Sequence, residues 1–295
     1  MGRVLAVLLF AAGIASACGS SSSSSRGTIA ALLKRPGPDV AATAGAGSFV
    51  PGQVRFPFLV IANNARPVER PSARVWVATG RNAKPFATTT AKLQPIGVPG
   101  HSEAAAGGVT RIYVAHFRIP RPGKYWFLAE PEGAKIQAVS VFQVAANLPV
   151  PAVGAKAPAS ATPTLATAPV PVLTTARPPD RALLHHSVAG SLAAHRPFVL
   201  TFATPKFCTS RVCGPVVDVV QAAARRFDSR GIRFIHVEVF QDNNPNKGYN
   251  RWMRQWGLRS EPWVFLVGRD GRIKAEFEGS VSLAELEAAI RARLP

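Results

Sequence analysis

The chain has 295 residues, which is enough for two ordinary domains that each bury a core. Apolar residues make up 47% of it and charged residues 17%, a composition that excludes disorder along the whole chain. The formal net charge is +19, but the lysines and arginines are scattered singly and no predicted helix carries a run of them. A nucleic-acid interface is therefore not favoured, and we expect a solvated, arginine-rich surface that is compatible with anionic lipid headgroups.

Residues 1–17 have the layout of a secretory signal peptide. A single positive charge at Arg3 precedes an apolar stretch over residues 4–14, and small residues occupy positions 15–17. The apolar stretch is too short to cross a bilayer as a helix. We therefore expect the protein to be exported.

Cys18 directly follows these small residues, and two cleavage modes compete. Residues 15–17 fit an ordinary A-x-A cleavage site, but small residues immediately before a cysteine also resemble the lipobox of bacterial lipoproteins. Gly19 and the six serines Ser20 to Ser25 form a flexible polar tether, which favours the lipoprotein mode. We predict that Cys18 is lipidated, that residues 18–26 are the tether, and that the protein is anchored by lipid to the outer face of the cytoplasmic membrane.

Residues 27–150 are predicted to form an all-β domain. Short alternating apolar runs are separated by Pro, Gly and Asn turn signals, as in an antiparallel sandwich. The candidate strands cover residues 54–61, 73–78, 86–93, 111–118, 124–129 and 138–144. The step Pro122-Gly123-Lys124-Tyr125-Trp126 resembles the turn and aromatic strand of immunoglobulin-like periplasmic modules. We therefore expect an immunoglobulin-like sandwich that acts as a spacer or docking module. His101 and His116 are isolated, so no metal-binding pair is expected there.

Residues 151–180 are rich in Pro, Ala and Thr and have neither helical nor strand periodicity, which indicates an extended lead-in. Within it, Val153-Gly154-Ala155-Lys156-Ala157-Pro158 resembles the opening segment of redoxins, a branch of the thioredoxin superfamily. This segment places the domain boundary near Pro151.

Residues 181–295 alternate between predicted strands and helices. Strands are expected over residues 198–203, 232–240, 263–267 and 273–277, and helices over residues 183–194, 215–227, 246–256 and 283–294. Asp270-Gly271 is a hairpin signal, and Ser282 with Glu285 three residues later forms a capping box. The order predicts an α/β sheet with a right-handed parallel crossover and an antiparallel edge.

This part of the chain resembles a thioredoxin-like domain. The resemblance rests on an apolar strand that leads to Cys208 and Cys213 at the start of a helix, on Glu261-Pro262 before the next strand, and on Gly279 before the last helix. Thioredoxins have a cis-proline at the position of Pro262, packed against the active disulfide. The resemblance therefore implies a cis Glu261-Pro262 bond and a redox-active cysteine pair, which lipidation of Cys18 would leave as the two remaining thiols.

The cysteine loop departs from the thioredoxin pattern in its spacing. Four residues separate Cys208 from Cys213, where thioredoxins have two. Two helical residues five apart have Cα atoms roughly 8.6 Å apart, which is beyond the span of a disulfide. The loop must therefore fold back before Pro215, the predicted first helical residue, if the two cysteines pair. Which cysteine attacks is left open.

The charged residues near the two cysteines would have opposite effects on the stability of a thiolate. The helix N-terminus, Arg211 and Lys206 would favour a thiolate at either cysteine, whereas Glu261 would disfavour it and offer a proton acceptor. The buried acid of thioredoxins is replaced by Thr201. His236 and Glu238 share one face of the second strand, and one of them could take over proton transfer; the alternative is a structural polar pair at the sheet end.

The spacing also resembles the peroxiredoxin Q group, in which the resolving cysteine follows the peroxidatic one by five residues. Thr204-Pro205-Lys206-Phe207-Cys208-Thr209 is similar to its active-site segment, with one residue too many between Thr204 and Cys208. The arginine of that family would be Arg259. The resemblance implies that peroxide would oxidise Cys208 and that Cys213 would resolve the sulfenic acid.

Two further functions remain open. The disulfide could be a structural staple in an exported binding protein, although closing a five-residue loop gains little chain entropy. Copper delivery, as in redoxins with C-x3-C and a distant histidine, is weaker because His185, His186 and His195 all precede the strand. We predict a membrane-tethered thiol-disulfide oxidoreductase whose catalytic residues are Cys208, Cys213, Pro262 and Glu261. Its partners would be protein thiols or disulfides, and no cofactor or metal is expected.

Overall fold

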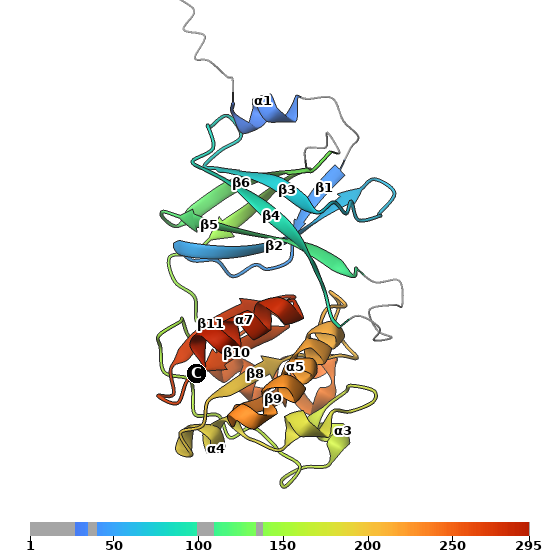
Figure 1. Ribbon diagram of the computed structural model, residues 1–295, viewed down its shortest axis with the longest axis vertical. Coiled ribbons are helices and arrows are strands. Elements are labelled where there is room, and N and C mark those ends of the chain that lie inside the picture. The colour runs from blue at the N-terminus through green and yellow to red at the C-terminus, as the bar shows by residue number, and fades with distance from the viewer. Residues whose placement is uncertain (1–26, 35–39, 99–108, 134–137, 295) are drawn as a thin grey trace, which may run out of the picture.

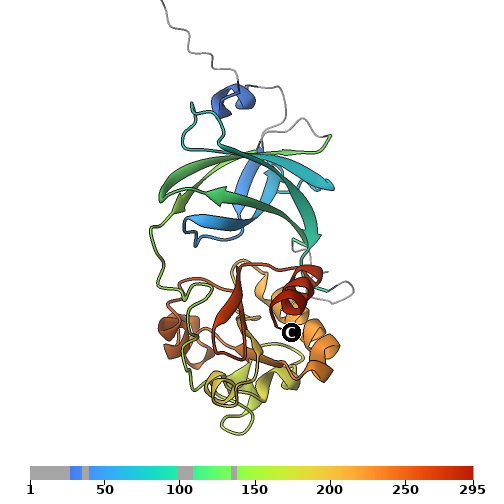
Figure 2. The same ribbon diagram turned by 60° about the vertical axis from the view of Figure 1, so that its left-hand side comes forward.

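The computed structural model describes residues 27–34, 40–98, 109–133 and 138–294. These residues form a β-barrel and a C-terminal α/β domain that lie end to end, joined by one connecting segment (Figures 1 and 2). The predicted signal peptide, Cys18 and the serine tether lie outside the described residues. In the part of the chain that the structure describes, no helix combines the length and the apolar character needed to span a bilayer.

The barrel contains all six strands that the alternating runs predict, and one more. Its strands are β1 (Val40–Ala44), β2 (Gly52–Ala62), β3 (Ser72–Ala78), β4 (Ala87–Pro95), β5 (Arg111–Ile119), β6 (Gly123–Pro131) and β7 (Ala138–Val144). Strand β1 was not predicted because its sequence, Val-Ala-Ala-Thr-Ala, lacks the large apolar residues that mark the others. The short helix α1 (Ile29–Leu33), capped by Thr28, covers one end of the barrel.

The expected immunoglobulin-like sandwich is replaced by a closed barrel, in the strand order β1-β2-β5-β4-β3-β6-β7. Strand β4 is the physical reason. Its residues 87–92 pair with β3 and its residues 92–95 pair with β5, so it joins what would have been two separate sheets. On the opposite side, β1 pairs antiparallel with β2 and parallel with β7.

The barrel core is aromatic. The ring of Phe56 lies 4.8 Å from the rings of both Phe127 and Phe142, centroid to centroid. Such tilted contacts add to the apolar area that the alternating side chains bury. Further buried rings in the same core come from Phe49, Phe58, Tyr113, Phe117 and Tyr125.

The connecting segment is packed against the α/β domain. Backbone hydrogen bonds join Gly154 and Ala155 to Ile273, and Ala157 to Gly271, with N–O distances of 2.8–2.9 Å. The lead-in thus pairs with the edge of the C-terminal sheet. It then forms the short helix α3 (Val170–Leu173) and reaches the 3-10 helix η1 (Arg181–Leu184).

The C-terminal domain has the predicted order of elements. These are α4 (Val188–Ala193), β8 (Phe198–Phe202), α5 (Cys213–Phe227), η2 (Asp228–Arg230), β9 (Arg233–Val237), η3 (Gln241–Asn243), η4 (Pro245–Lys247), α6 (Arg251–Gln255), β10 (Trp263–Val267), β11 (Ile273–Glu278) and α7 (Leu283–Arg293). The sheet order is β11-β10-β8-β9, with β8 and β9 parallel and the other pairs antiparallel. The predicted parallel crossover and antiparallel edge are thus confirmed.

Two helix predictions were wrong in their extent. The helix expected over residues 183–194 is interrupted, because the Ser187 side chain accepts the N–H of Gly190 and starts a new helix there. The helix expected over residues 246–256 begins only after Asn250, whose side chain accepts the N–H groups of Trp252 and Met253.

Both faces of the sheet are buried. One face packs against α5 and α7 through an apolar cluster that includes Val199, Val216 and Leu286. The other packs against α4 and α6 through a cluster that includes Val188 and Trp256. Because helices bury both faces of the sheet, the central strands have continuous apolar sequences.

The two domains meet through hydrogen bonds and an ion pair. Arg55 of β2 binds the Glu285 carboxylate of α7, with an Nε–Oε1 distance of 2.6 Å, and donates to the carbonyl of Ser280. Glu278 of β11 accepts the backbone N–H of Ser48 at 2.7 Å. One of the two hydrogen bonds of the predicted capping box is confirmed, because the Ser282 hydroxyl accepts the N–H of Glu285. The Glu285 carboxylate binds Arg55 of the barrel.

Gly279 is predicted to be essential to this interface between the two domains. Its φ is +75°, and a Cβ there would collide with the carbonyl oxygen of Gly45 in the barrel. We expect Gly279→Ala to lower the free energy of unfolding by about 2 kcal/mol or more and to increase protease cleavage between the domains. Gly47→Ala is the control, because a Cβ there meets no atom within 4 Å. Equal stability of the two variants in urea would contradict this.

Glu276 is predicted to make the stability pH-dependent. It lines a cavity of about 350 Å³ between the domains, and its Oε2 is buried without a hydrogen-bond partner among the described residues. Burial, with a smaller contribution from Glu278, raises its pKa from 4.5 to about 7. The folded state therefore holds this proton more tightly than the unfolded state, and stability falls as the pH rises from about 4.5 to about 7.

Glu276→Gln should flatten this dependence. Above pH 7 we expect the variant to be more stable than the natural protein by roughly 1–3 kcal/mol, with the difference vanishing below about pH 4.5. Denaturant unfolding at several pH values checks it, with Glu132→Gln on the barrel surface as control. A pH dependence identical to that of the natural protein would refute the assignment.

Candidate functional site

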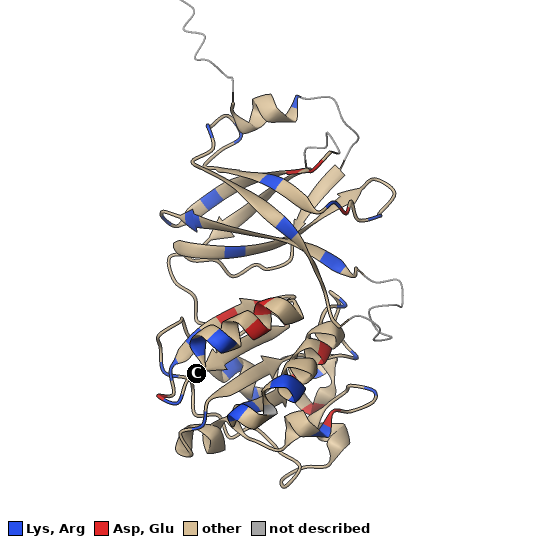
Figure 3. Ribbon diagram, viewed as in Figure 1, with Lys and Arg blue, Asp and Glu red and all other residues tan. Residues whose placement is uncertain are grey.

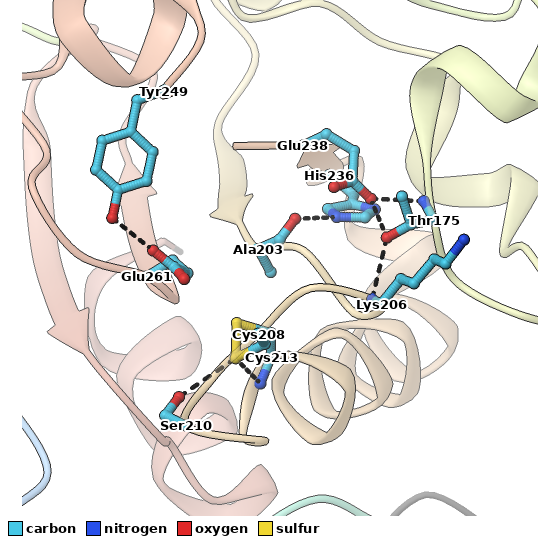
Figure 4. Close-up of a disulfide and its surroundings, with 10 residues drawn as sticks. All are labelled: Thr175, Ala203, Lys206, Cys208, Ser210, Cys213, His236, Glu238, Tyr249 and Glu261. Atoms are coloured by element: carbon cyan, nitrogen blue, oxygen red, sulfur yellow. Dashed lines mark hydrogen bonds between the residues drawn. A yellow bond between two sulfur atoms is a disulfide. The ribbon is translucent and has the colours of Figure 1, made fainter. Parts of the chain in front are cut away.

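The candidate site lies at one end of the C-terminal sheet, where four elements meet. Strands β8 and β9 are parallel and end there, and α5 begins there after the loop that follows β8. Strand β10 starts at the same end, since Trp263 pairs with Phe202, the last residue of β8. The cysteine loop, the end of β9 and the residues before β10 are thereby brought together (Figure 4).

Cys208 and Cys213 form a disulfide, as predicted, with their Cα atoms 5.9 Å apart. The loop folds back in the expected way. Arg211 adopts a left-handed conformation with φ of 60°, and its N–H donates to the carbonyl of Cys208. Helix α5 starts at Cys213, two residues before the predicted Pro215, so this cysteine lies in the first helical turn.

The two sulfurs differ in exposure and in contacts. Cys213 is fully buried, whereas Cys208 is partly exposed. The Cys208 sulfur accepts the backbone N–H of Cys213 at 3.3 Å, and the Ser210 hydroxyl lies 3.2 Å from it. Because a disulfide sulfur carries no proton, the hydroxyl is the donor. Two donors therefore already face the sulfur that would become negative on reduction.

Lys206 does not fill the role expected of it. Figure 4 shows its side chain directed away from the two sulfurs. Its Nζ lies 5.1 Å from the centre of the Phe207 ring, and its backbone N–H donates to Thr175. The charge of Lys206 is thus available to a partner beside the cysteine loop.

Glu261 is held by a tyrosine. The Tyr249 hydroxyl donates to Oε2 of Glu261 at 2.8 Å (Figure 4), and burial together with this carboxylate raises the pKa of Tyr249. Sequence reasoning missed Tyr249, because it lies outside the recognisable motif and contacts Glu261 only in the folded chain. The Glu261-Pro262 peptide is cis, as predicted, and Pro262 is buried.

His236 and Glu238 are buried at the end of β9, each with its own hydrogen bonds. His236 Nε2 lies 3.0 Å from the carbonyl oxygen of Ala203. Glu238 Oε1 accepts the Oγ1–H of Thr175 at 2.8 Å and also its backbone N–H, while Oε2 is buried without a partner among the described residues. Thr175 in turn accepts the N–H of Lys206. Glu238 therefore helps to fix the cysteine loop to the lead-in segment.

Thr201 and Thr204 place two buried hydroxyls near the disulfide end of the sheet. Neither hydroxyl has a hydrogen-bond partner among the described residues. Thr201 is in register with His236 on β9 and Val264 on β10, at the position where thioredoxins keep an acid. Because a hydroxyl does not ionise near neutral pH, proton transfer needs another group.

Among the described residues, no hydrogen bond joins either cysteine to the residues expected for the other functions. Arg259 is exposed, and its one described contact is between its backbone carbonyl and the Tyr249 hydroxyl. His185 lies at the end of η1, and His195 follows α4. No group of three or more His, Cys, Asp or Glu side chains suited to a metal occurs among the described residues.

Comparison with known proteins adds a structural similarity to these observations. No protein-family profile matches the sequence, and no curated protein matches it. Among solved structures, the chain is similar to a thiol:disulfide interchange protein of the thioredoxin family from Chlorobium tepidum TLS, with 16% identity and a TM-score of 0.30. That match covers 51% of this chain and 100% of the other.

In the reduced protein, Cys208 should be the reactive thiol. Because it is partly exposed and faces two donors, we expect iodoacetamide to modify it at least about tenfold faster than the buried Cys213 at neutral pH. Mass spectrometry of a time course measures both rates in one sample. The variants Cys208→Ser and Cys213→Ser identify each product. Equal rates, or faster modification of Cys213, would reverse the assignment.

Proposed function

We propose that the protein is an exported thiol-disulfide oxidoreductase in which Cys208 and Cys213 alternate between dithiol and disulfide. The main support is Cys208, a partly exposed residue whose sulfur accepts the N–H of Cys213 at the start of α5. An N–H at a helix N-terminus stabilises negative charge on its acceptor, so a thiolate at Cys208 is favoured after reduction. The buried Cys213 suits the resolving role.

The exchange proceeds in two balanced steps. The Cys208 thiolate attacks one sulfur of a substrate disulfide, forms a mixed disulfide and releases the other substrate sulfur as a thiolate. The Cys213 thiolate then attacks the Cys208 sulfur, closes the internal disulfide and releases the second substrate thiolate. Two electrons pass from the dithiol to the substrate, and the reverse sequence oxidises a substrate dithiol.

His236 is the proposed acceptor of the Cys213 proton. Phe234 packs in the same apolar cluster as Cys213, on the face of the sheet that α5 covers. Since His236 lies two residues after Phe234 on β9, the His236 side chain is on that same face. Because the Ala203 carbonyl can only accept, His236 Nε2 carries the hydrogen, and Nδ1 is the acceptor in the neutral ring. Glu238 and Glu261, engaged by Thr175 and Tyr249, act as positioning residues.

A thiol peroxidase is the second candidate. Its support is the buried hydroxyl of Thr204, which has no hydrogen-bond partner in the described part of the chain and lies in the segment that is similar to peroxiredoxin Q. In that case peroxide would oxidise the Cys208 thiolate to a sulfenic acid, and Cys213 would displace water to form the disulfide. A redox-inactive binding protein with a structural disulfide is the third.

The site of action proposed for this chemistry is outside the cytoplasmic membrane. The support is the sequence alone, through the signal-like residues 1–17, Cys18 and the serine tether. Substrates would then be thiols or disulfides of exported proteins. The barrel, fixed to the C-terminal domain by Arg55 and Glu285, would hold the site away from the bilayer.

The activity is tested with the purified chain carrying Cys18→Ser, so that only one cysteine pair remains. We expect turnover of a peptide disulfide, a reduction potential above about −300 mV, and loss of turnover by about a hundredfold or more in Cys208→Ser and Cys213→Ser. His236→Gln should slow turnover without slowing alkylation of Cys208. Lys124→Gln, on the barrel surface, is the control.

Two outcomes would remove the proposal. A potential below about −300 mV with turnover of neither peptide disulfide nor hydrogen peroxide would indicate a structural disulfide. Rapid peroxide consumption that depends on Cys208, together with slow disulfide exchange, would establish the peroxidase instead.

A further inference from the structure

A cationic hollow of about 440 Å³ adjoins the cysteine loop. We define it by Pro171, Arg177, Pro205, Lys206, Phe207 and Asn243, which belong to its lining. The hollow is therefore built by three segments that are distant in the sequence: the lead-in around α3, the loop that follows β8, and η3, which contributes Asn243.

The hollow and the reactive sulfur share one loop. Lys206 and Phe207 line the hollow and directly precede Cys208. The backbone N–H of Lys206 donates to Thr175 at 3.2 Å, and Thr175 is bound to the buried Glu238. These bonds fix the lead-in wall of the hollow against the cysteine loop. The hollow consequently borders the loop that carries Cys208.

The lining of the hollow contains two cationic side chains and no carboxylate. Arg177 and Lys206 are exposed, and neither forms an ion pair with a described residue. Carboxylates that adjoin the lining residues are otherwise engaged: Asp180 accepts the N–H of Ala182, Glu238 binds Thr175, and Asp242 pairs with Lys247 at 2.9 Å. Lysines and arginines are spread over both domains (Figure 3), but these two flank a concave site.

A second hollow of about 220 Å³ continues the first, since Arg177 and Pro205 line both. It runs along the start of α5, where Gly214 follows Cys213, and it ends near the exposed Arg225. Its lining contains one carboxylate, Asp218, which already interacts within the chain. The two hollows together form a groove with apolar prolines at its centre and cationic side chains along it.

We propose that this groove binds an acidic polypeptide segment of the substrate protein, next to the cysteine that exchanges with Cys208. This inference rests on the proposed function and names the substrate class. Carboxylates would pair with Lys206 and Arg177, while Pro171, Pro205 and Phe207 supply apolar contacts. A polypeptide is favoured over an anionic lipid surface because the site is concave, borders the loop that carries Cys208 and extends along the start of α5.

The proposal is tested with three cystine-containing peptides of equal length that carry Asp, Ser or Lys on both sides of the disulfide. At low salt we expect the Asp peptide to exchange about tenfold faster than the Lys peptide, and the ratio to fall below about twofold at 0.5 M NaCl. Lys206→Gln with Arg177→Gln should lower the Asp-to-Lys rate ratio about fivefold. Lys124→Gln with Arg118→Gln, the matched charge change on the barrel, should leave the ratio unchanged.

A binding measurement separates this proposal from the proposed function. The variant Cys208→Ser with Cys213→Ser cannot exchange, yet it should bind the Asp peptide more tightly than the Lys peptide in fluorescence anisotropy. Equal rates and equal binding for all peptides overturn the groove proposal while leaving the oxidoreductase intact. Failure of exchange with every peptide overturns the oxidoreductase, and the anisotropy result then still decides the groove. Binding to vesicles of anionic phospholipid that needs Lys206 and Arg177, without preference for the Asp peptide, would assign the groove to lipid instead.

Discussion

The hydrogen bond from the Cys213 N–H to the Cys208 sulfur is the interaction on which the site depends. It exists because Arg211 takes a left-handed conformation, which turns the loop back to the first turn of α5. The same geometry buries Cys213 and leaves Cys208 partly exposed. The two cysteines thus have different surroundings, and on this difference the proposed roles of the two thiols rest.

The rest of the chain supports that geometry from several sides. Thr175, on the lead-in, holds Lys206 by its backbone and is itself held by Glu238, so a segment outside the sheet fixes the cysteine loop. The lead-in is in turn bound to the edge of β11. Beyond it, Arg55 and Glu285 join the domain to the barrel, which makes the two domains one connected body.

How far the sequence predicts the structure depends on how local each feature is. Alternating side chains in β2 to β7 and the continuous apolar runs of β8 and β10 are local signals, so these strands were predicted closely. Closure of the barrel was not, because it depends on pairings between strands that are distant in the sequence: β2 with β5, β3 with β6 and β1 with β7. The cysteine pair was expected from the thioredoxin resemblance and from the cysteine count, while its spacing required a loop that folds back. The contact of Glu261 with Tyr249 and the cationic hollow form only when separate segments meet.

Trapping the mixed disulfide shows whether Cys208 attacks and Cys213 resolves, as we propose. Reduced Cys213→Ser and Cys208→Ser variants, each also carrying Cys18→Ser, are mixed with a peptide disulfide and analysed by mass spectrometry without reductant. We expect Cys213→Ser to accumulate a stable adduct on Cys208. Adduct formation on the buried Cys213 of the other variant should be far slower. Rapid adduct formation on Cys213 with little on Cys208 would show that the proposed roles are reversed.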